Sequence, residues 1–142
     1  MGNNERKTNL RIGEVYLMNF EGTGNEQKGW RPGVILQNNV GNTHSPNVIA
    51  VPLTSAIKKK GQPTHVFVNA KDSGLPKDSI VLCENPKTIS KDKVGEFITV
   101  LPDGYMERVA VAHLLATAAI SFLSIETLVN TREIAIKLNE VA

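Results

Sequence analysis

Short apolar runs rich in β-branched or aromatic residues recur along the first 84 residues. They read GEVYLMNF (13–20), PGVILQN (32–38), NVIAVPLT (47–54), THVFVNA (64–70) and DSIVLCE (78–84), and polar stretches with Gly, Asn, Pro or Lys separate them. Runs of this length and composition predict β-strands. Five such runs predict a compact, β-rich body.

The pattern changes after residue 84. SKDKV (90–94) predicts one helical turn capped by Ser90, and EFITVLP (96–102) predicts a further strand. Pro102 has no N–H for a strand ladder, so the strand is expected to end there and a helix to open at Pro102 and Asp103.

The C-terminal part predicts helix, because residues 105–142 contain neither Gly nor Pro. An apolar stripe follows i, i+3, i+4, i+7 and i+11, which predicts one amphipathic helix with this stripe on its apolar face: Val111, Leu114, Leu115, Ala118 and Phe122. A second stripe comprises Ile125, Leu128, Val129 and Ile136. It fits a separate helix starting near Ser124 or a continuation of the first, and the pattern leaves both open.

Length and composition predict one domain. The chain has 142 residues, of which 41% are hydrophobic and 21% charged. We expect a polar, flexible leader (1–11), a single domain (12–123) and a helical C-terminal extension (124–142). The longest stretch of low charge, residues 109–125, is interrupted by polar side chains and lies far from the N-terminus, so we expect a cytoplasmic protein with no membrane contact.

The single cysteine, the net charge and the spacing of the histidines limit which kinds of site the chain can form. Cys83 is the only cysteine and sits in the apolar run SIVLC, so burial without a disulfide is expected. The net charge of +2 permits a polyanionic partner without establishing one. His44, His65 and His113 are widely separated, and neither metal-ligand spacings nor glycine-rich nucleotide motifs occur. We therefore expect no metal and no cofactor.

Polar residues with phosphate-binding chemistry stand at two predicted strand ends. Arg31 precedes Pro32 where one strand begins, and Thr54 and Ser55 stand where another ends. Antiparallel neighbours place such ends on the same rim of a sheet. A guanidinium and a hydroxyl with nearby lysines can hold a phosphate, although exposed Arg and Thr at strand ends are also common as solvated residues.

The ordered segments GEVYLMNF, GNEQKGWRPGVILQNNVGN, SPNVIAVPLTS, PTHVFV and DSIVLCE resemble the MazF/PemK family of toxin endoribonucleases. The resemblance covers residues 12–121 and includes the R-P, Q-N-N-x-G-N, S-P and P-T-H elements. It implies an α+β fold, an SH3-like or CcdB-like twisted antiparallel β-barrel with a C-terminal helix. It also implies a homodimer with RNA in its interface grooves and a cognate MazE-like antitoxin as partner.

The same resemblance implies that Arg31 and Thr54 are catalytic. The RNA 2′-hydroxyl would attack the adjacent phosphorus without a metal, leaving a 2′,3′-cyclic phosphate and a 5′-hydroxyl. A guanidinium stays protonated, so Arg31 suits stabilisation of the phosphorane charge rather than proton abstraction. Thr54 would donate or relay a hydrogen bond to the same phosphoryl oxygen. The sequence does not identify the group that deprotonates the 2′-hydroxyl.

Loop residues are expected to read single-stranded bases by stacking and by hydrogen bonds. The candidates for RNA binding are Asn25, Gln27, Lys28, Trp30, Ser55, Gln62 and Lys87. Trp30 fits a packing role as well as base stacking, and the run 58–60 of three lysines fits a solvated loop as well as phosphate contact.

The chain departs from the family pattern in two places. Asn85, Pro86 and Lys87 stand where many members have Gln, an apolar residue and Arg, and Lys cannot form the bidentate fork of Arg. The tail beyond residue 124 is longer than a minimal member needs, and it is expected to extend a dimer contact or to pack on the barrel.

Two readings from other classes remain open at this stage. Gyrase poisons share the fold family and inhibit a protein, but they lack a counterpart of the Arg31 and Thr54 pair. A catalytically silent SH3-like module would bind protein and leave RNA intact. RNA cleavage by the purified chain separates both readings from the nuclease.

Overall fold

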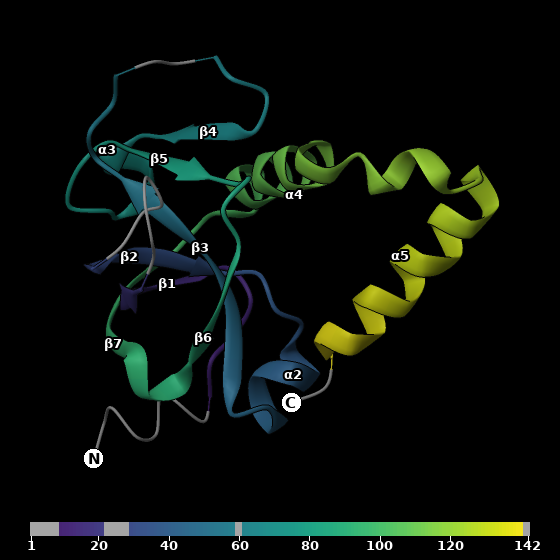
Figure 1. The fold of residues 1–142 in the computed structure, drawn as a ribbon, viewed down its shortest axis with the longest axis horizontal. Helices are drawn as coiled ribbons and strands as arrows, with labels where there is room; N and C mark the ends of the chain where they lie inside the picture. Colours follow the sequence, from purple (N-terminus) through teal and green to yellow (C-terminus); the bar gives the residue numbers. More distant parts are fainter. Residues whose placement is uncertain (1–8, 22–28, 59–60, 141–142) are drawn as a thin grey trace.

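Antiparallel strand pairing organises the body of the protein (Figure 1). The computed structural model describes residues 9–21, 29–58 and 61–140. The strands are β1 (Glu14–Phe20), β2 (Gly29–Ile35), β3 (Asn47–Thr54), β4 (His65–Val68), β5 (Ser79–Leu82), β6 (Lys87–Ser90) and β7 (Val94–Val100). Their order is β4-β5-β3-β2-β1-β7, with β6 paired to β3.

The described strands form an open sheet, so the closed barrel expected from the resemblance is not found among them: β4 and β7 each have one neighbour. The reason lies in β3, which changes partner along its length. Its first half, from Asn47 to Ala50, pairs with β6, and its last residues, Leu53 and Thr54, pair with β5. The sheet therefore splays at β3 instead of closing on itself.

The predicted strands are all present, and three short elements were missed. The polar stretch between β2 and β3 contains α2 (Asn39–His44), whose first turn is capped because the Asn38 side chain accepts from the Gly41 N–H at 2.9 Å. The helix α3 (Ala70–Ser73) and strand β6 are only four residues each, too short to show a period. Ser90 caps the 3₁₀ turn η1 (Lys91–Lys93), as predicted.

Two groups of buried apolar residues hold the sheet together. One includes Val15, Val51, Val81 and Cys83 and continues to Val109 of the C-terminal helix. The other includes Tyr16, Met18, Phe20, Ile35 and Leu10. Leu10 is only 1% exposed, so the packed body begins inside the predicted leader, whose residues 1–8 lie outside the described part. Cys83 is buried, as predicted.

The C-terminal part forms separate helices: α4 (Asp103–Thr117), the 3₁₀ turn η2 (Ala119–Phe122) and α5 (Ile125–Glu140). Ala118, with φ +56°, ends α4 in the left-handed conformation. This decides the alternative that the sequence left open in favour of two helices. In Figure 1, α5 stands away from the sheet and its last turn approaches α2. Within the described chain, no helix is long and apolar enough to cross a membrane.

The predicted buried stripe of α4 is wrong. Val109 and Ala112 face the body, whereas Val111, Leu114 and Leu115 are 52%, 43% and 53% exposed. Phe122 lies beyond α4 and is 91% exposed. The helix is apolar on both sides, so its period identifies the helix but does not determine which side the sheet covers.

Candidate active site

Arg31 and Thr54 meet in one hollow, as their positions at strand ends predicted. Arg31 lies on β2 and Thr54 ends the neighbouring strand β3, which is antiparallel to β2. Both line a hollow of about 470 Å³, together with Trp30, Ser55 and other residues of the same strands. We call it the Arg31–Thr54 hollow. A permanent cation and a hydroxyl thus face one space large enough for a nucleotide-sized group.

The position of Arg31 depends on close packing of β2 against β1. Arg31 pairs with Met18 across the two strands, and its side chain is half-buried. Two residues later, a Cβ on Gly33 would stand 2.5 Å from Cζ of Phe20 and 2.9 Å from Sδ of Met18. Only glycine lets β2 lie this close to the ring of Phe20, so Gly33 sets the distance between that ring and the strand that carries Arg31.

Thr54 is oriented by its own backbone. Its Oγ1 accepts a hydrogen bond from the Ala56 N–H at 3.1 Å. A hydroxyl that accepts one bond in this way still has its O–H available as a donor. Thr54 can therefore donate toward the hollow that it shares with Arg31, and donation to a phosphoryl oxygen stays a prediction.

Trp30 packs against β7 and also lines the hollow, so its packing role is seen in the structure and base stacking stays a prediction. Its side chain is 55% exposed and lines the Arg31–Thr54 hollow. A Cβ on Gly95 of β7 would stand 3.2 Å from Cζ3 of Trp30, so the ring rests against this glycine. One part of the indole is anchored to β7, and the remainder is open to an aromatic partner.

A second hollow continues the first. It measures about 300 Å³ and is lined by residues including Thr54, Ala56, Lys58, Gln62 and His65. Thr54 and Ala56 belong to both hollows, so they form one trench with Thr54 at its middle. Gln62 lies in this trench as a candidate base reader. Lys58 lies there too, whereas Lys59 and Lys60 fall outside the described residues.

His65 is a site residue that the sequence analysis did not select. It faces the trench from β4, and its Nε2 lies 2.9 Å from Oε2 of Glu84. Among the described residues, its buried Nδ1 has no hydrogen-bond partner. The P-T-H motif was noted only as a family element. Strand pairing, which sets His65 opposite Leu82, is what brings its ring to the Thr54 side of the sheet.

Of the other candidates that the structure describes, Ser55 lies in the trench and Lys87 does not. Lys87 lines a separate hollow of about 170 Å³ with Lys93, and Lys93 is paired with Glu21. Asn25, Gln27 and Lys28 lie outside the described residues. Ser55 is exposed and lines the Arg31–Thr54 hollow.

The described residues offer no cluster of three or more His, Cys, Asp or Glu side chains that would hold a metal ion. Cys83 is unsuited to chemistry: burial raises the pKa of its thiol to about 12, and the charge of Glu84 adds to the shift. A neutral, buried thiol is neither a nucleophile nor a metal ligand at neutral pH. Arg31, Thr54 and their neighbours in the trench are the candidate reactive groups that the structure brings together.

The chain is similar to characterised proteins over most of its length. Residues 11–114 match the model of a family described as PemK-like, MazF-like toxin of type II toxin-antitoxin system. Endoribonuclease EndoA of Bacillus subtilis (strain 168) is 39% identical over 114 residues, which are 80% of this chain and 98% of that protein.

Solved structures show the same fold. The Mycobacterium tuberculosis toxin MazF-mt6 superposes with a TM-score of 0.63 and 28% identity, over 74% of this chain and 96% of that one. A mycobacterial endoribonuclease in complex with its cognate antitoxin gives a TM-score of 0.62 and 28% identity, over 77% of this chain and 95% of that one.

Proposed function

Because this chain belongs to the PemK-like, MazF-like toxin family of type II toxin-antitoxin systems, we propose that it is an endoribonuclease toxin that cuts single-stranded RNA at the Arg31–Thr54 hollow. The observation that carries the proposal is that Arg31 and Thr54, from neighbouring strands, line one hollow. The similarity to EndoA supports the reaction class, since the match spans nearly the whole of that protein.

The proposed reaction is a transfer of the phosphodiester to the neighbouring 2′-oxygen. The 2′-hydroxyl loses its proton to solvent, its oxygen bonds to phosphorus, and the bond from phosphorus to the 5′-oxygen breaks, which leaves a 2′,3′-cyclic phosphate and a 5′-hydroxyl. Arg31 stabilises the negative charge that builds on the phosphoryl oxygens, and one of its N–H groups protonates the departing 5′-oxygen before the guanidine regains a proton from solvent. Thr54 donates its O–H to a phosphoryl oxygen.

We propose that this reaction needs no metal. The charge that a metal ion would neutralise at the phosphorus is met by the guanidinium of Arg31, which is permanently protonated. The donors are preorganised, because Arg31 is held by the β1–β2 pairing and Thr54 by its bond from Ala56. Preorganised donors stabilise a developing charge without reorganisation during the reaction.

The trench favours a single strand over a duplex. The open part of the Trp30 ring offers a stacking surface on one side of Thr54, and Gln62 and His65 offer hydrogen-bonding groups on the other. Stacking and base-edge contacts of this kind require bases that are free of a complementary strand. The scissile phosphate is therefore placed at Thr54, with flanking nucleotides in the two hollows.

We also propose a symmetric homodimer and a cognate antitoxin as partners. A structurally similar mycobacterial endoribonuclease was solved in complex with its cognate antitoxin. A toxin of this kind is held inactive when a partner segment covers its RNA trench, and a disordered segment that folds on binding is suited to covering a long, shallow surface.

The test is incubation of the purified protein with a long single-stranded RNA, once with Mg²⁺ and once with EDTA, beside Arg31→Ala and the control Lys71→Ala, which removes an exposed cation on α3. We expect cuts at a short motif with 5′-hydroxyl ends in both conditions for the wild type and for Lys71→Ala, and loss of about 10²- to 10³-fold in rate for Arg31→Ala. Intact RNA in both conditions with folded wild-type protein would contradict the nuclease. Cleavage that disappears only in EDTA would contradict metal independence.

A further inference from the structure

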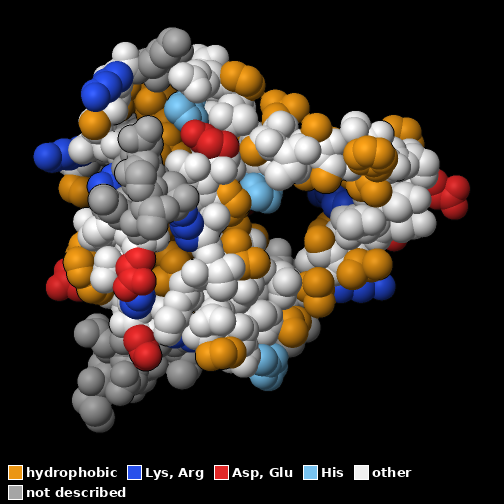
Figure 2. Space-filling model, in the orientation of Figure 1, with side chains coloured by type: hydrophobic (Ala, Val, Ile, Leu, Met, Phe, Trp, Pro, Cys, Tyr) orange, Lys and Arg blue, Asp and Glu red, His pale blue; other side chains and the backbone are white. Residues whose placement is uncertain are grey.

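The exposed apolar side chains of the described residues concentrate in the C-terminal helices. Nine large hydrophobic residues between positions 111 and 136 are 40–91% exposed: Val111, Leu114, Leu115, Phe122, Leu123, Ile125, Val129, Ile134 and Ile136. Figure 2 shows apolar side chains spread over this part of the molecule and an open gap between it and the body. Residues 118–140, which we call the C-terminal arm, lie beyond the family match at 11–114.

The arm lacks the packing that a helix in water needs. None of the 16 residues of α5 is buried, and two hydrogen bonds join its last turn to the body, both between Asn139 and Asn39. Isolated helices of about 12–15 residues are marginal in water, and most helix stability in proteins comes from a packed apolar face. Ile125, Val129 and Ile136 form such a face at i, i+4 and i+11, and another surface must cover it.

The exposed area matches what a stable protein interface buries. At roughly 180 Å² for a fully exposed side chain of this size, the eight residues other than Ile134, which lies on the other side of α5, expose roughly 800 Å². A stable dimer buries about 800 Å² on each partner, whereas the largest apolar patch on a monomer is about 300–600 Å². The helices from residue 103 to 140 carry five acidic and three basic side chains, so they do not attract RNA.

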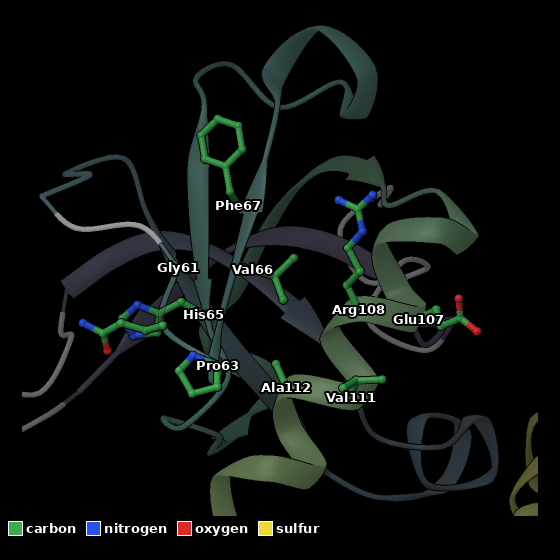
Figure 3. A pocket seen from close by; sticks show the side chains of 10 residues that line it. Gly61, Pro63, His65, Val66, Phe67, Glu107, Arg108, Val111 and Ala112 are labelled. Carbon is green, nitrogen blue, oxygen red and sulfur yellow. The ribbon is translucent and has the colours of Figure 1, made fainter.

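A groove on the same chain is suited to receive the arm. It has a volume of about 490 Å³ and runs between β4 and α4, with Val66, Phe67, Val111 and Ala112 among its lining residues. Figure 3 shows Val66 on the strand and Ala112 on the helix facing the space between them, with Arg108 nearby. Val111 lies both in this groove and on the outer apolar side of α4, so groove and exposed face are continuous.

Phe122 lies at the end of η2, just beyond α4, which ends at Thr117. In a twofold pair of antiparallel α4 helices that meet at Leu114 and Leu115, Ala118 at the end of one α4 lies opposite Val111 of the other. Val111 lines the groove, so Phe122 follows α4 close to the partner's groove. Phe122 is 91% exposed on its own copy, and an isologous contact would bury it twice.

We propose that the C-terminal arm docks on a second copy of this chain, with Phe122 in the partner's β4–α4 groove and the outer faces of the two α4 helices in contact. This deepens the homodimer of the proposed function and assigns the arm a role in it. The C-terminal helices carry little net charge, and one chain carries both the exposed Phe122 and an apolar groove. Both features favour a second copy over a nucleic acid.

The first test measures the dimer dissociation constant by analytical ultracentrifugation for the wild type, Phe122→Asp and the control Ile134→Asp. Ile134 is 60% exposed but lies on the opposite side of α5 from Ile136, two residues away on a helix. We expect Phe122→Asp to raise the constant about 30-fold or more and Ile134→Asp to leave it within about threefold. An unchanged constant for Phe122→Asp, or a wild type that stays monomeric, overturns the proposal.

The second test is cross-linking of Leu115→Cys under mild oxidation, with Ile134→Cys as control. We expect a disulfide-linked dimer for Leu115→Cys only, and its absence contradicts the α4 contact. The native Cys83 does not compete, because it is buried. RNA cleavage by the same variants is scored separately. Cleavage by the wild type with an unchanged dissociation constant for Phe122→Asp supports the nuclease and contradicts the role of the arm. A raised dissociation constant for Phe122→Asp with no cleavage by the wild type supports the role of the arm and contradicts the nuclease.

Discussion

Asn39 and Asn139 lie 100 residues apart in the sequence and are joined by two hydrogen bonds, from the Asn39 N–H to Oδ1 of Asn139 at 3.0 Å and from Nδ2 of Asn39 to the Asn139 carbonyl at 3.2 Å. The Oδ1 of Asn39 also accepts from the Ile12 N–H and from Nδ2 of Asn42. The asparagine-rich motif that precedes β3 therefore holds the far end of the C-terminal arm. The hydrogen bonds between Asn39 and Asn139 fix where the arm ends, while the apolar face of α5 stays uncovered.

Replacing Asn139 by Ala should loosen the arm without unfolding the body. The substitution removes the Oδ1 that accepts from the Asn39 N–H and keeps the backbone carbonyl that accepts from Nδ2 of Asn39, so one of the two bonds is lost and the freed N–H meets water. We expect amide hydrogen exchange in α5 to rise at least about tenfold and the free energy of unfolding to fall by about 1 kcal/mol. Asn130→Ala, on the same helix and exposed, should change neither quantity. Unchanged exchange in Asn139→Ala would show that the bond to Oδ1 does not hold the arm.

Substitutions of Thr54 should separate its hydroxyl from its shape. Thr54→Val keeps the volume and removes the donor, so we expect kcat to fall by about 10²- to 10³-fold with a small change in KM. Thr54→Ser keeps the hydroxyl and the bond from the Ala56 N–H, and should retain most of the activity. Single-turnover cleavage of an oligonucleotide that contains the mapped site measures both. Equal activity of the Val and Ser variants would remove Thr54 from the chemistry.

Gly33→Ala should destabilise the protein, because the new methyl group would stand 2.5 Å from Cζ of the buried Phe20. Overpacking of this kind lowers the free energy of unfolding by about 1–3 kcal/mol. Gly104→Ala is the matched control, since a Cβ there meets nothing within 4 Å and alanine favours the first turn of α4. Urea unfolding of both variants should give opposite signs relative to the wild type. A neutral Gly33→Ala would mean that β2 can move away from Phe20.

Trp30 should report RNA binding by its fluorescence, because it is the only tryptophan and lines the Arg31–Thr54 hollow. We expect quenching when a short, uncleavable 2′-deoxy oligonucleotide binds, since a base then stacks on the open part of the indole. In Gly95→Ala the new Cβ would lie 3.2 Å from Cζ3 of Trp30, so the indole ring should shift and oligonucleotide binding should weaken severalfold. A Trp30 signal that ignores bound oligonucleotide would leave the residue with a packing role alone.

Cys83 should make stability depend on pH in the alkaline range. Burial raises the pKa of its thiol from 9.0 to about 12 in the folded protein. A group whose pKa is raised on folding contributes its full stability below the unfolded pKa and loses it as the pH rises toward the folded pKa. We expect the stability advantage of wild type over Cys83→Ala to shrink by roughly 1 kcal/mol per pH unit above 9.0. A constant difference between the two proteins from pH 8 to 11 would contradict this.

The strand positions and the meeting of Arg31 with Thr54 were accessible from the sequence. Short apolar runs rich in β-branched or aromatic residues mark β1 and β3. Strands that follow one another after a short connection pair antiparallel. Residues at adjacent strand ends then share a rim, which is why the two candidates meet. The sequence analysis did not select His65, because the position of its ring depends on the pairing of β4 with β5. The local sequence pattern does not specify that pairing.

The sequence by itself determined the local elements and the residue types of the site, because periodicity, caps and turn residues act over a few positions. Only the tertiary structure decided which side of α4 is buried, since Val109 and Leu114 are both apolar and packing against the sheet selects one of them. It also decided that the sheet stays open at β4 and that Asn139 reaches Asn39. These contacts join residues far apart in the chain, and their free energy depends on surfaces that exist only once the body has folded.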